Sequence, residues 1–286
     1  MVSAYTECGR FCIFNSVKLL ILLALAVPGW AQSVSILMGA RGAALGYATA
    51  ASFDEWSIFN NPAGLAAVRQ STASFALEAV PALPGANRTG AAFTQPFSAG
   101  AGSVAVFRFG DQLYSEQLLI VGYGHQIGNT ALGVRLSHIQ YRASGFETRH
   151  ALGVTAGGIT QLLPTLWIGA YAININMPTI GETQEKIPTL LLAGLRYQPT
   201  ERTTLATEVE KDVERDLIWK SGIEYNVHPK IYARSGFWTS PSALFLGVGF
   251  TPHRLKVDYA LQHSWVLGTR HMLSATYSIN RKNKGA

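Results

Sequence analysis

Apolar and polar residues alternate along the chain from about Ser71 onward. In the segment LIWKSGIEYNV, one face holds the large apolar side chains Leu217, Trp219, Ile223, Tyr225 and Val227. The opposite face holds charged, small or polar residues, and the segments LKVDYALQ and MLSATYSIN repeat the same period. A period of two places successive side chains on opposite faces of a β-strand. The pattern therefore predicts an all-β chain whose strands have one apolar and one polar face.

Breaks between these runs alternate in length. Six are short, and five of the six contain proline, which cannot donate to a strand ladder. They are Gln95-Pro96, Gly128-Asn129, Pro164-Thr165, Pro199-Thr200, Pro229-Lys230 and Pro252-His253. The breaks between them are mostly longer and more polar, as in VPALPGANRTG, NMPTIGETQEKIP and WTSPSA. The alternation predicts an antiparallel barrel of about 14 strands, with short periplasmic turns, longer external loops and both termini in the periplasm.

Composition favours a membrane barrel. Of the 286 residues, 48% are hydrophobic and 14% are charged, whereas soluble domains are about 25% charged. The longest apolar run, Leu19–Val27, is about nine residues, and a membrane-spanning helix needs roughly 20. A soluble two-layer sandwich would show the same alternation, but the depletion of charge and the turn pattern favour a transmembrane β-barrel. The net charge of +6 is too small and scattered to predict nucleic-acid binding.

The first 31 residues have the pattern of a secretory signal. Arg10 and Lys18 precede the apolar run LLILLALAV, and small residues around Ala31 predict cleavage after that position. Both cysteines, Cys8 and Cys12, lie in this segment. We therefore expect a mature chain without a disulfide or a metal thiolate.

Candidate chemistry is sparse. Gly39, Gly42 and Gly46 lack the spacing of a dinucleotide fingerprint, so we expect them to allow close backbone packing. His263 and His271 flank the last loop and, with Asp258, form the only conceivable acid–base cluster, but no nucleophile elbow accompanies them. The histidines also lack the spacing of a zinc-binding helix. We predict no catalytic residue, no metal site and no cofactor.

Charges of both signs occupy the polar face of the later strands. Glu208 and Glu210 could form a carboxylate pair for acid–base work, but a solvated, salt-bridged barrel interior explains them better. The residues predicted to face the lumen are Glu208, Glu210, Lys220, Glu224, Arg234, Lys256 and Asp258. Tryptophans near the predicted strand ends suggest an interfacial aromatic girdle. These are Trp56, Trp167, Trp219, Trp238 and Trp265.

Two segments carry a resemblance to a known family. GARGAALGYATAASFDEWSIFNNPAGLA, residues Gly39–Ala66, resembles the N-terminal segment of PorV/PorQ outer-membrane proteins. VDYALQHSWVLGTRHMLSATYSI, residues Val257–Ile279, is similar to the closing hairpin of that family. Together they cover about 50 residues, and the chain departs from the barrel pattern by ending in RKNKGA rather than in an aromatic residue.

The resemblance implies a FadL-like barrel of fourteen strands whose lumen is plugged by an N-terminal hatch. The N-P-A motif of such hatches falls on Asn61, Pro62 and Ala63. We expect a signal at 1–31, the hatch at 32–69, the barrel at 70–280 and a periplasmic tail at 281–286. The predicted hatch residues are Gly39, Arg41, Gly42, Gly46, Asn60, Asn61, Pro62, Ala63 and Gly64.

The resemblance also implies a function. PorV/PorQ-like proteins are associated with type IX secretion in Bacteroidota, so we expect a non-enzymatic barrel in the outer membrane of a Gram-negative bacterium. Outer-membrane lipid would surround it. Secretion components or cargo would be its protein partners, bound by the loops Val80–Gly90 and Asn176–Pro188. The alternative is a passive transporter that carries a hydrophobic small molecule through a plugged lumen.

Overall fold

The protein is described by a computed structural model. It describes residues 35–181, 185–212, 216–266 and 268–279. The predicted signal and the predicted C-terminal tail lie outside the described residues. Among the described residues, no helix combines the length and the apolarity needed to cross a membrane.

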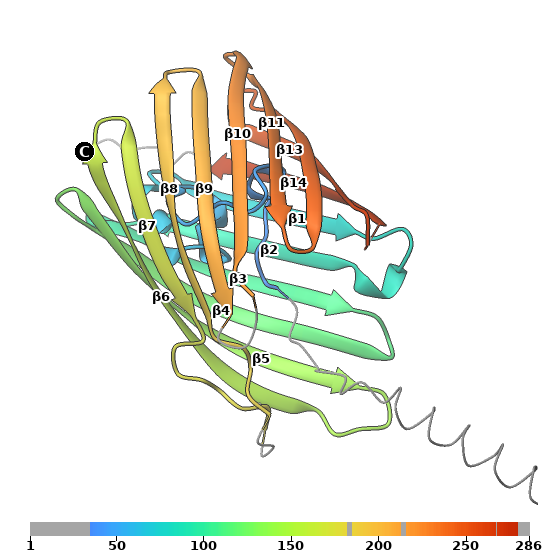
Figure 1. Ribbon diagram of the computed structural model, residues 1–286. Coiled ribbons are helices and arrows are strands. Elements are labelled where there is room, and N and C mark those ends of the chain that lie inside the picture. Colours follow the sequence, from blue (N-terminus) through green and yellow to red (C-terminus); the bar gives the residue numbers. More distant parts are fainter. Residues whose placement is uncertain (1–34, 182–184, 213–215, 267, 280–286) are drawn as a thin grey trace, which may run out of the picture. The chain divides into compact units, whose positions relative to one another are not determined.

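Fourteen antiparallel strands close into one barrel (Figure 1), which confirms the predicted fold class and strand number. Each strand pairs with its neighbours in sequence, and β1 closes the barrel against β14, with Ser71 opposite Ile279. The strands are β1 (Ser71–Ala79), β2 (Arg88–Pro96), β3 (Gly100–Gly110), β4 (Tyr114–Ile127), β5 (Thr130–Ala143), β6 (Arg149–Leu163), β7 (Leu166–Ile173), β8 (Leu190–Thr200), β9 (Thr203–Asp212), β10 (Ile218–His228), β11 (Ile231–Thr239), β12 (Ser242–Phe250), β13 (Leu255–Ser264) and β14 (Gly268–Ile279).

The strand connections fall where the sequence predicts them, but several differ in their bounds. β2 and β8 continue through Pro96 and Thr200, so two of the short turns lie slightly later than expected. The break WTSPSA contracts to Ser240 and Pro241, because β11 and β12 stay paired as far as Thr239 and Ser242. The alternation of short and long connections is therefore not strict.

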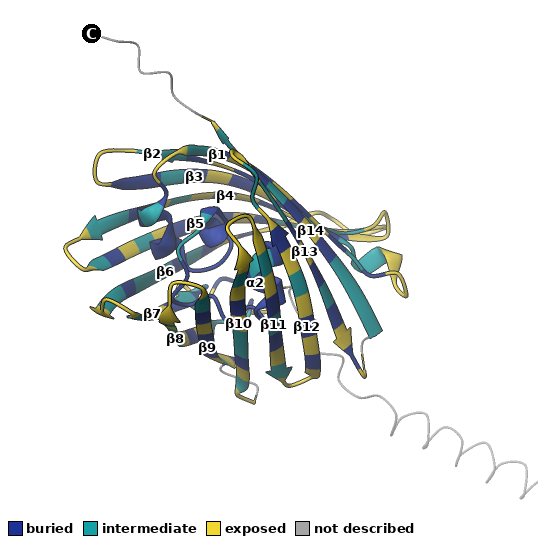
Figure 2. Ribbon diagram, turned by 90° about the horizontal axis from the view of Figure 1, so that it is seen from above, coloured by how far each residue is buried: buried dark blue, intermediate teal, exposed yellow. Residues whose placement is uncertain are grey.

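Buried and exposed residues alternate along the strands with the predicted period of two (Figure 2). Which of the two faces is buried distinguishes a membrane barrel from a sandwich. On β10 the apolar side chains of Trp219 and Tyr225 are 51% and 45% exposed. The charged side chains of Lys220 and Glu224, on the opposite face, are only 1% and 7% exposed. A soluble sandwich would bury the apolar face and expose the charges. The reverse arrangement is that of a transmembrane barrel, in which the apolar face meets lipid.

The segment before β1 lies inside the barrel (Figure 1). It forms α2 (Ala40–Ala44) and two 3₁₀ helices, η1 (Glu55–Ile58) and η2 (Pro62–Ala67). α2 packs against β11–β14, whereas η2 packs against β3–β6. A further 3₁₀ turn, η3 (Pro84–Ala86), lies in the connection between β1 and β2. We call residues 35–68 the lumenal segment.

The described ends of the chain lie at opposite ends of β1. The backbone carbonyl of Ser35 accepts a hydrogen bond of 2.6 Å from Arg88, which begins β2 after the β1–β2 connection. Ile279 instead pairs with Ser71, at the start of β1. The even strand count places the ends of the barrel sheet together, but the lumenal segment crosses the interior before β1 begins.

The predicted aromatic girdle is wrong for three of the five tryptophans. Trp56 belongs to η1 and is 3% exposed. Trp238 packs against Tyr47 of the lumenal segment, and Trp167 packs with Phe53. Trp219 and Trp265 are the exposed ones, at 51% and 69%. Closeness to a strand end does not reveal whether a side chain faces lipid or the lumen. These three indoles pack with partners in the lumenal segment.

Candidate functional site

Arg41 joins the lumenal segment to the barrel wall through a network of charges. Its guanidinium donates two hydrogen bonds of 2.9 Å to the two carboxylate oxygens of Glu224 and one of 3.1 Å to Asp54. Arg234 bridges Glu224, at 2.5 Å, and Asp258, at 2.6 Å. The charge of Glu224 raises the pKa of Arg41 well above its ordinary value. Forked pairing of this kind fixes orientation as well as position.

Glu208 of β9 holds the backbone of the lumenal segment. Its Oε2 atom accepts hydrogen bonds from the amides of Thr49, at 2.9 Å, and Ala50, at 2.7 Å. Its Oε1 atom accepts from Lys220 Nζ at 2.9 Å, and Lys220 also binds Glu210 at 2.6 Å. Glu208 and Lys220 are each 1% exposed. A buried carboxylate with all these partners is a rigid anchor, because losing Lys220 would leave its charge unpaired and losing an amide would leave a buried lone pair unsatisfied.

A second charged cluster joins β1, β2 and β14 to the lumenal segment. Arg88 pairs with Glu78, and Arg270 donates to the other oxygen of Glu78 at 3.2 Å. The hydroxyl of Tyr47 lies 3.4 Å from the Glu78 carboxylate. Burial raises the pKa of Tyr47 above its ordinary value, so its phenol stays neutral and donates. Sequence reasoning missed Glu78 and Arg88, although the alternation in STASFALEA places Glu78 on the polar face of its strand.

The predicted N-P-A motif forms the start of η2. The Asn61 side chain accepts a hydrogen bond of 3.1 Å from the amide of Ala63 and so caps the helix, with Pro62 at its first position. Its amide nitrogen donates to the carbonyls of Ala50, at 2.6 Å, and Gly158, at 3.3 Å. This one asparagine therefore ties two parts of the lumenal segment to β6.

The remaining predicted hatch residues all lie in the lumenal segment. Gly39 adopts φ 101° against the Trp56 ring, and a Cβ there would lie 2.6 Å from Trp56 Cγ. Gly46 adopts φ 65°, and its carbonyl accepts a hydrogen bond from the Trp238 indole. Asn60 donates to the carbonyl of Met38 at 3.2 Å. Gly42 lies within α2, and Gly64 packs tightly against Ser57.

Glycines in the wall let the lumenal segment approach the strands. A Cβ on Gly222 of β10 would lie 2.6 Å from Leu45 Cα, and one on Gly124 of β4 would lie 2.7 Å from the Ala66 nitrogen. A Cβ on Gly133 of β5 would come even closer to the backbone of Pro62 and Ala63. Any larger residue at these positions would push the segment away from the wall.

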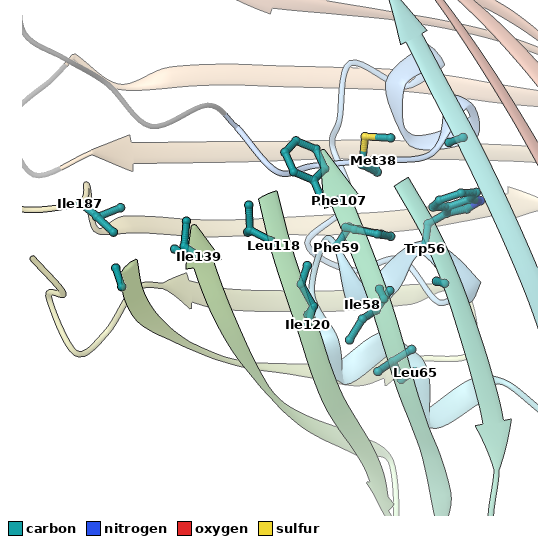
Figure 3. Packing of buried hydrophobic residues seen from close by; sticks show 14 of the residues in the cluster. Met38, Trp56, Ile58, Phe59, Leu65, Phe107, Leu118, Ile120, Ile139 and Ile187 are labelled. Atoms are coloured by element: carbon teal, nitrogen blue, oxygen red, sulfur yellow. The ribbon is translucent and has the colours of Figure 1, made fainter. Parts of the chain in front are cut away.

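An apolar cluster packs the lumenal segment against β2–β5 (Figure 3). Ile58 and Phe59 are fully buried among Phe107, Leu118 and Ile120 of β3 and β4. The same cluster continues through Ile139 of β5 to Ile187 in the β7–β8 connection. The lumenal segment is therefore held mainly by charge against β9 and β10 and mainly by hydrophobic packing against β3 and β4.

Arg135 of β5 binds a backbone carbonyl of the lumenal segment. Its guanidinium donates a hydrogen bond of 2.8 Å to the carbonyl of Ile58, at the C-terminal end of η1, and one of 3.0 Å to the Thr155 hydroxyl. A cation is favourable at that end of a helix because the carbonyls there lack helical partners.

All the predicted lumen-facing charges lie inside the barrel. The prediction of a solvated interior is wrong for Glu208, Lys220 and Arg234, because the lumenal segment covers them. Lys256 reaches Glu55 of η1 at 3.2 Å, and its side chain is 45% exposed.

The conceivable acid–base cluster does not form. Asp258 faces the lumen and binds Arg234, whereas His263 and His271 contact Thr269 and Tyr259 on the opposite face of the sheet. An odd separation along one strand puts Asp258 and His263 on different faces. Within the described ranges, no group of three or more His, Cys, Asp and Glu side chains could hold a metal ion.

Comparisons with known proteins show the fold. No family model and no curated protein matches the chain. Among solved structures, the monoaromatic hydrocarbon channel CymD superimposes with a TM-score of 0.67, at 13% identity, over 88% of this chain and 100% of that one. The toluene transporter TodX of P. putida gives 0.66, at 10% identity, over 87% and 100%. A FadL homologue of Pseudomonas aeruginosa gives 0.62, at 12% identity, over 86% and 100%.

The fold is that of the FadL-like channels, a barrel of fourteen strands with an N-terminal segment before it. This likeness agrees with the FadL-like architecture that the sequence resemblance implied. The narrower resemblance to PorV and PorQ stays a prediction.

Proposed function

We propose that this chain is an outer-membrane channel for hydrophobic small molecules and that the lumenal segment is its plug. The exposed apolar exterior suits lipid, and the predicted export signal suits the outer membrane. The structural neighbours are described as hydrocarbon channels, a toluene transporter and a FadL homologue.

The apolar lining of one inner wall carries this proposal. Phe107, Leu118 and Ile139 face the lumen on three successive strands, at 2%, 4% and 4% exposure. They connect Ile187, in the β7–β8 connection, with the plug residue Phe59. An apolar wall offers water no partners but stabilises a hydrophobic solute by about 25 cal/mol for each Å² it buries. When the plug moves, this wall provides a path for such a solute.

The resemblance of Gly39–Ala66 to PorV/PorQ proteins supports a second candidate, an accessory role in type IX secretion or surface attachment. In that role the loops Val80–Gly90 and Asn176–Pro188 would bind secretion components or cargo. The two roles differ in what crosses the barrel, so uptake and partner recovery separate them.

Uptake of radiolabelled toluene and of a fluorescent long-chain fatty acid tests the proposal. Cells that make the wild-type chain should take up at least one of the two several-fold faster than cells with an empty vector. Leu118→Glu, which places a charge on the apolar wall, should abolish the gain, whereas the volume-conserving Leu118→Met should keep it. Uptake equal to that of the vector, with recovery of secretion components from native membranes, would establish the second candidate instead.

A further inference from the structure

A row of polar side chains crosses the outward face of β2–β6. Strand register places its members directly side by side, in the order Thr89, Arg108, Gln117, Gln140 and His150. Their neighbours along each strand, among them Phe107, Leu118 and Ile139, are buried on the lumen side. Because strands alternate, the row itself faces away from the lumen. The row places polar side chains on a face that also carries many exposed apolar ones.

The row lies at one edge of the lipid-facing band. Along β4, the outward residues after Gln117 include Leu119, Val121 and Tyr123, and the strand ends at Ile127. About ten residues from Gln117 to Ile127 extend roughly 33 Å along the strand. A tilt of about 40° reduces this to about 25 Å across the membrane, which is the height of the apolar band of outer-membrane barrels. The row thus lies at headgroup level, at the end of β4 that follows the β3–β4 connection.

A groove of about 340 Å³ opens at this level. Its polar side is formed by Arg108, Gln117, His138 and Gln140, and its apolar side includes Phe75, Val106 and Leu119. Next to it, the His138 ring stacks on His150 with centroids 5.2 Å apart and an interplanar angle of 20°. The groove therefore has donors on one side and a hydrocarbon surface on the other.

The groove attracts negative charge. None of the described residues that line it carries a carboxylate, and Glu116, which lies next to Gln117, points into the lumen and is 0% exposed. Arg108 makes no ion pair with any of the described residues. Its planar guanidinium can donate two parallel hydrogen bonds to a phosphate group, and the side-chain amides of Gln117 and Gln140 add neutral donors.

We propose that this groove binds the phosphorylated headgroup of lipid A in the outer leaflet. The phosphate lies against Arg108 and the neighbouring glutamine amides, with the histidine pair beyond them on β5 and β6. The acyl chains follow the apolar rows that start at Val106 and Leu119. Charge complementarity selects the phosphate, and continuity of the groove with the lipid-facing band selects a lipid as its carrier. This inference rests on the proposed outer-membrane location, with the longer connections outside.

Native mass spectrometry of the full chain in detergent tests the inference, with lipid A and lipid A stripped of its phosphates as probes. Wild type should retain lipid A at least tenfold more tightly than the stripped lipid, and Arg108→Gln should remove about tenfold of that affinity. Gln117→Ala, which leaves the charge in place, should cause a smaller loss. Arg254→Gln, an exposed arginine in the β12–β13 turn, is the matched control and should change nothing.

Equal retention of both lipids would overturn the inference, and so would displacement of lipid A by inorganic phosphate at the same concentration. Heat-modifiable migration and membrane fractionation of each variant show separately whether a folded barrel is present. A folded, membrane-inserted barrel that retains lipid A and the stripped lipid equally would contradict this inference alone. A soluble periplasmic chain would contradict the proposed function as well.

Discussion

Arg41 in α2 and Glu224 in β10 form a two-pronged ion pair, with both nitrogen–oxygen distances at 2.9 Å, although 183 residues separate them. The pair connects the lumenal segment, the proposed plug, to the wall at a position where Glu224 already binds Arg234. Its strength should therefore set how readily the plug leaves the lumen.

Replacing Arg41 with glutamine should loosen the plug. Breaking a fully buried pair costs about 3–5 kcal/mol; a loss nearer 2 kcal/mol is expected here because Glu224 keeps Arg234. That loss raises the population of the released plug by about thirtyfold. The fraction of time that single barrels conduct in a planar bilayer measures it. Arg254→Gln should conduct as rarely as wild type. If Arg41→Gln also conducts no more often than wild type, the pair does not hold the plug.

Two adjacent glycines in β6 offer a matched comparison. A Cβ on Gly157 would overlap Asn61 Oδ1 and lie 2.6 Å from Tyr171 Cβ, whereas one on Gly158 would meet Leu132 at an ordinary 3.4 Å. Gly157→Ala should therefore destabilise the barrel by about 1–3 kcal/mol, and Gly158→Ala should be close to neutral. Urea unfolding in lipid vesicles measures both. Equal midpoints would mean that Asn61 does not lie against the wall.

Glu208 should protect two specific amides. Glu208→Ala removes the acceptor for Thr49 and Ala50 and leaves Lys220 with Glu210 alone. Hydrogen exchange at those two amides should quicken at least tenfold, because an amide exchanges when its hydrogen bond opens. Glu201→Ala, in the exposed β8–β9 turn, should leave their exchange as it is. Unchanged protection in Glu208→Ala would show that other contacts hold this part of the plug.

Depth in the membrane should decide the cost of a lysine on β4. Val121 is 44% exposed and faces the centre of the band, whereas Gln117 lies at its edge. Val121→Lys should cost about 2–4 kcal/mol and Gln117→Lys at most about 1 kcal/mol. Unfolding in vesicles compares them, and similar costs would contradict the band proposed for this wall.

Much of the barrel was predictable from local signals. Proline-marked turns and the period of two gave the strand number, and they placed Lys220 and Glu224 on the inner face. The partners of Glu224 and Glu208 were not predictable, because Arg41 and Thr49 meet them only when the lumenal segment packs inside a closed barrel. Trp56 and Trp238 were misplaced for the same reason, since a strand-end indole suits either lipid or a plug. His263 could have been separated from Asp258 by counting along their shared strand.

Conductance of the chain lacking residues Asp54–Ala66 tests the central claim most directly. This deletion removes η1 and nearly all of η2 but leaves every strand intact. In a planar bilayer the wild-type chain should be closed for most of the recording, and the deleted chain should show large, lasting conductance once heat-modifiable migration confirms a folded barrel. Conductance equal to that of wild type would contradict the claim that this segment closes the lumen.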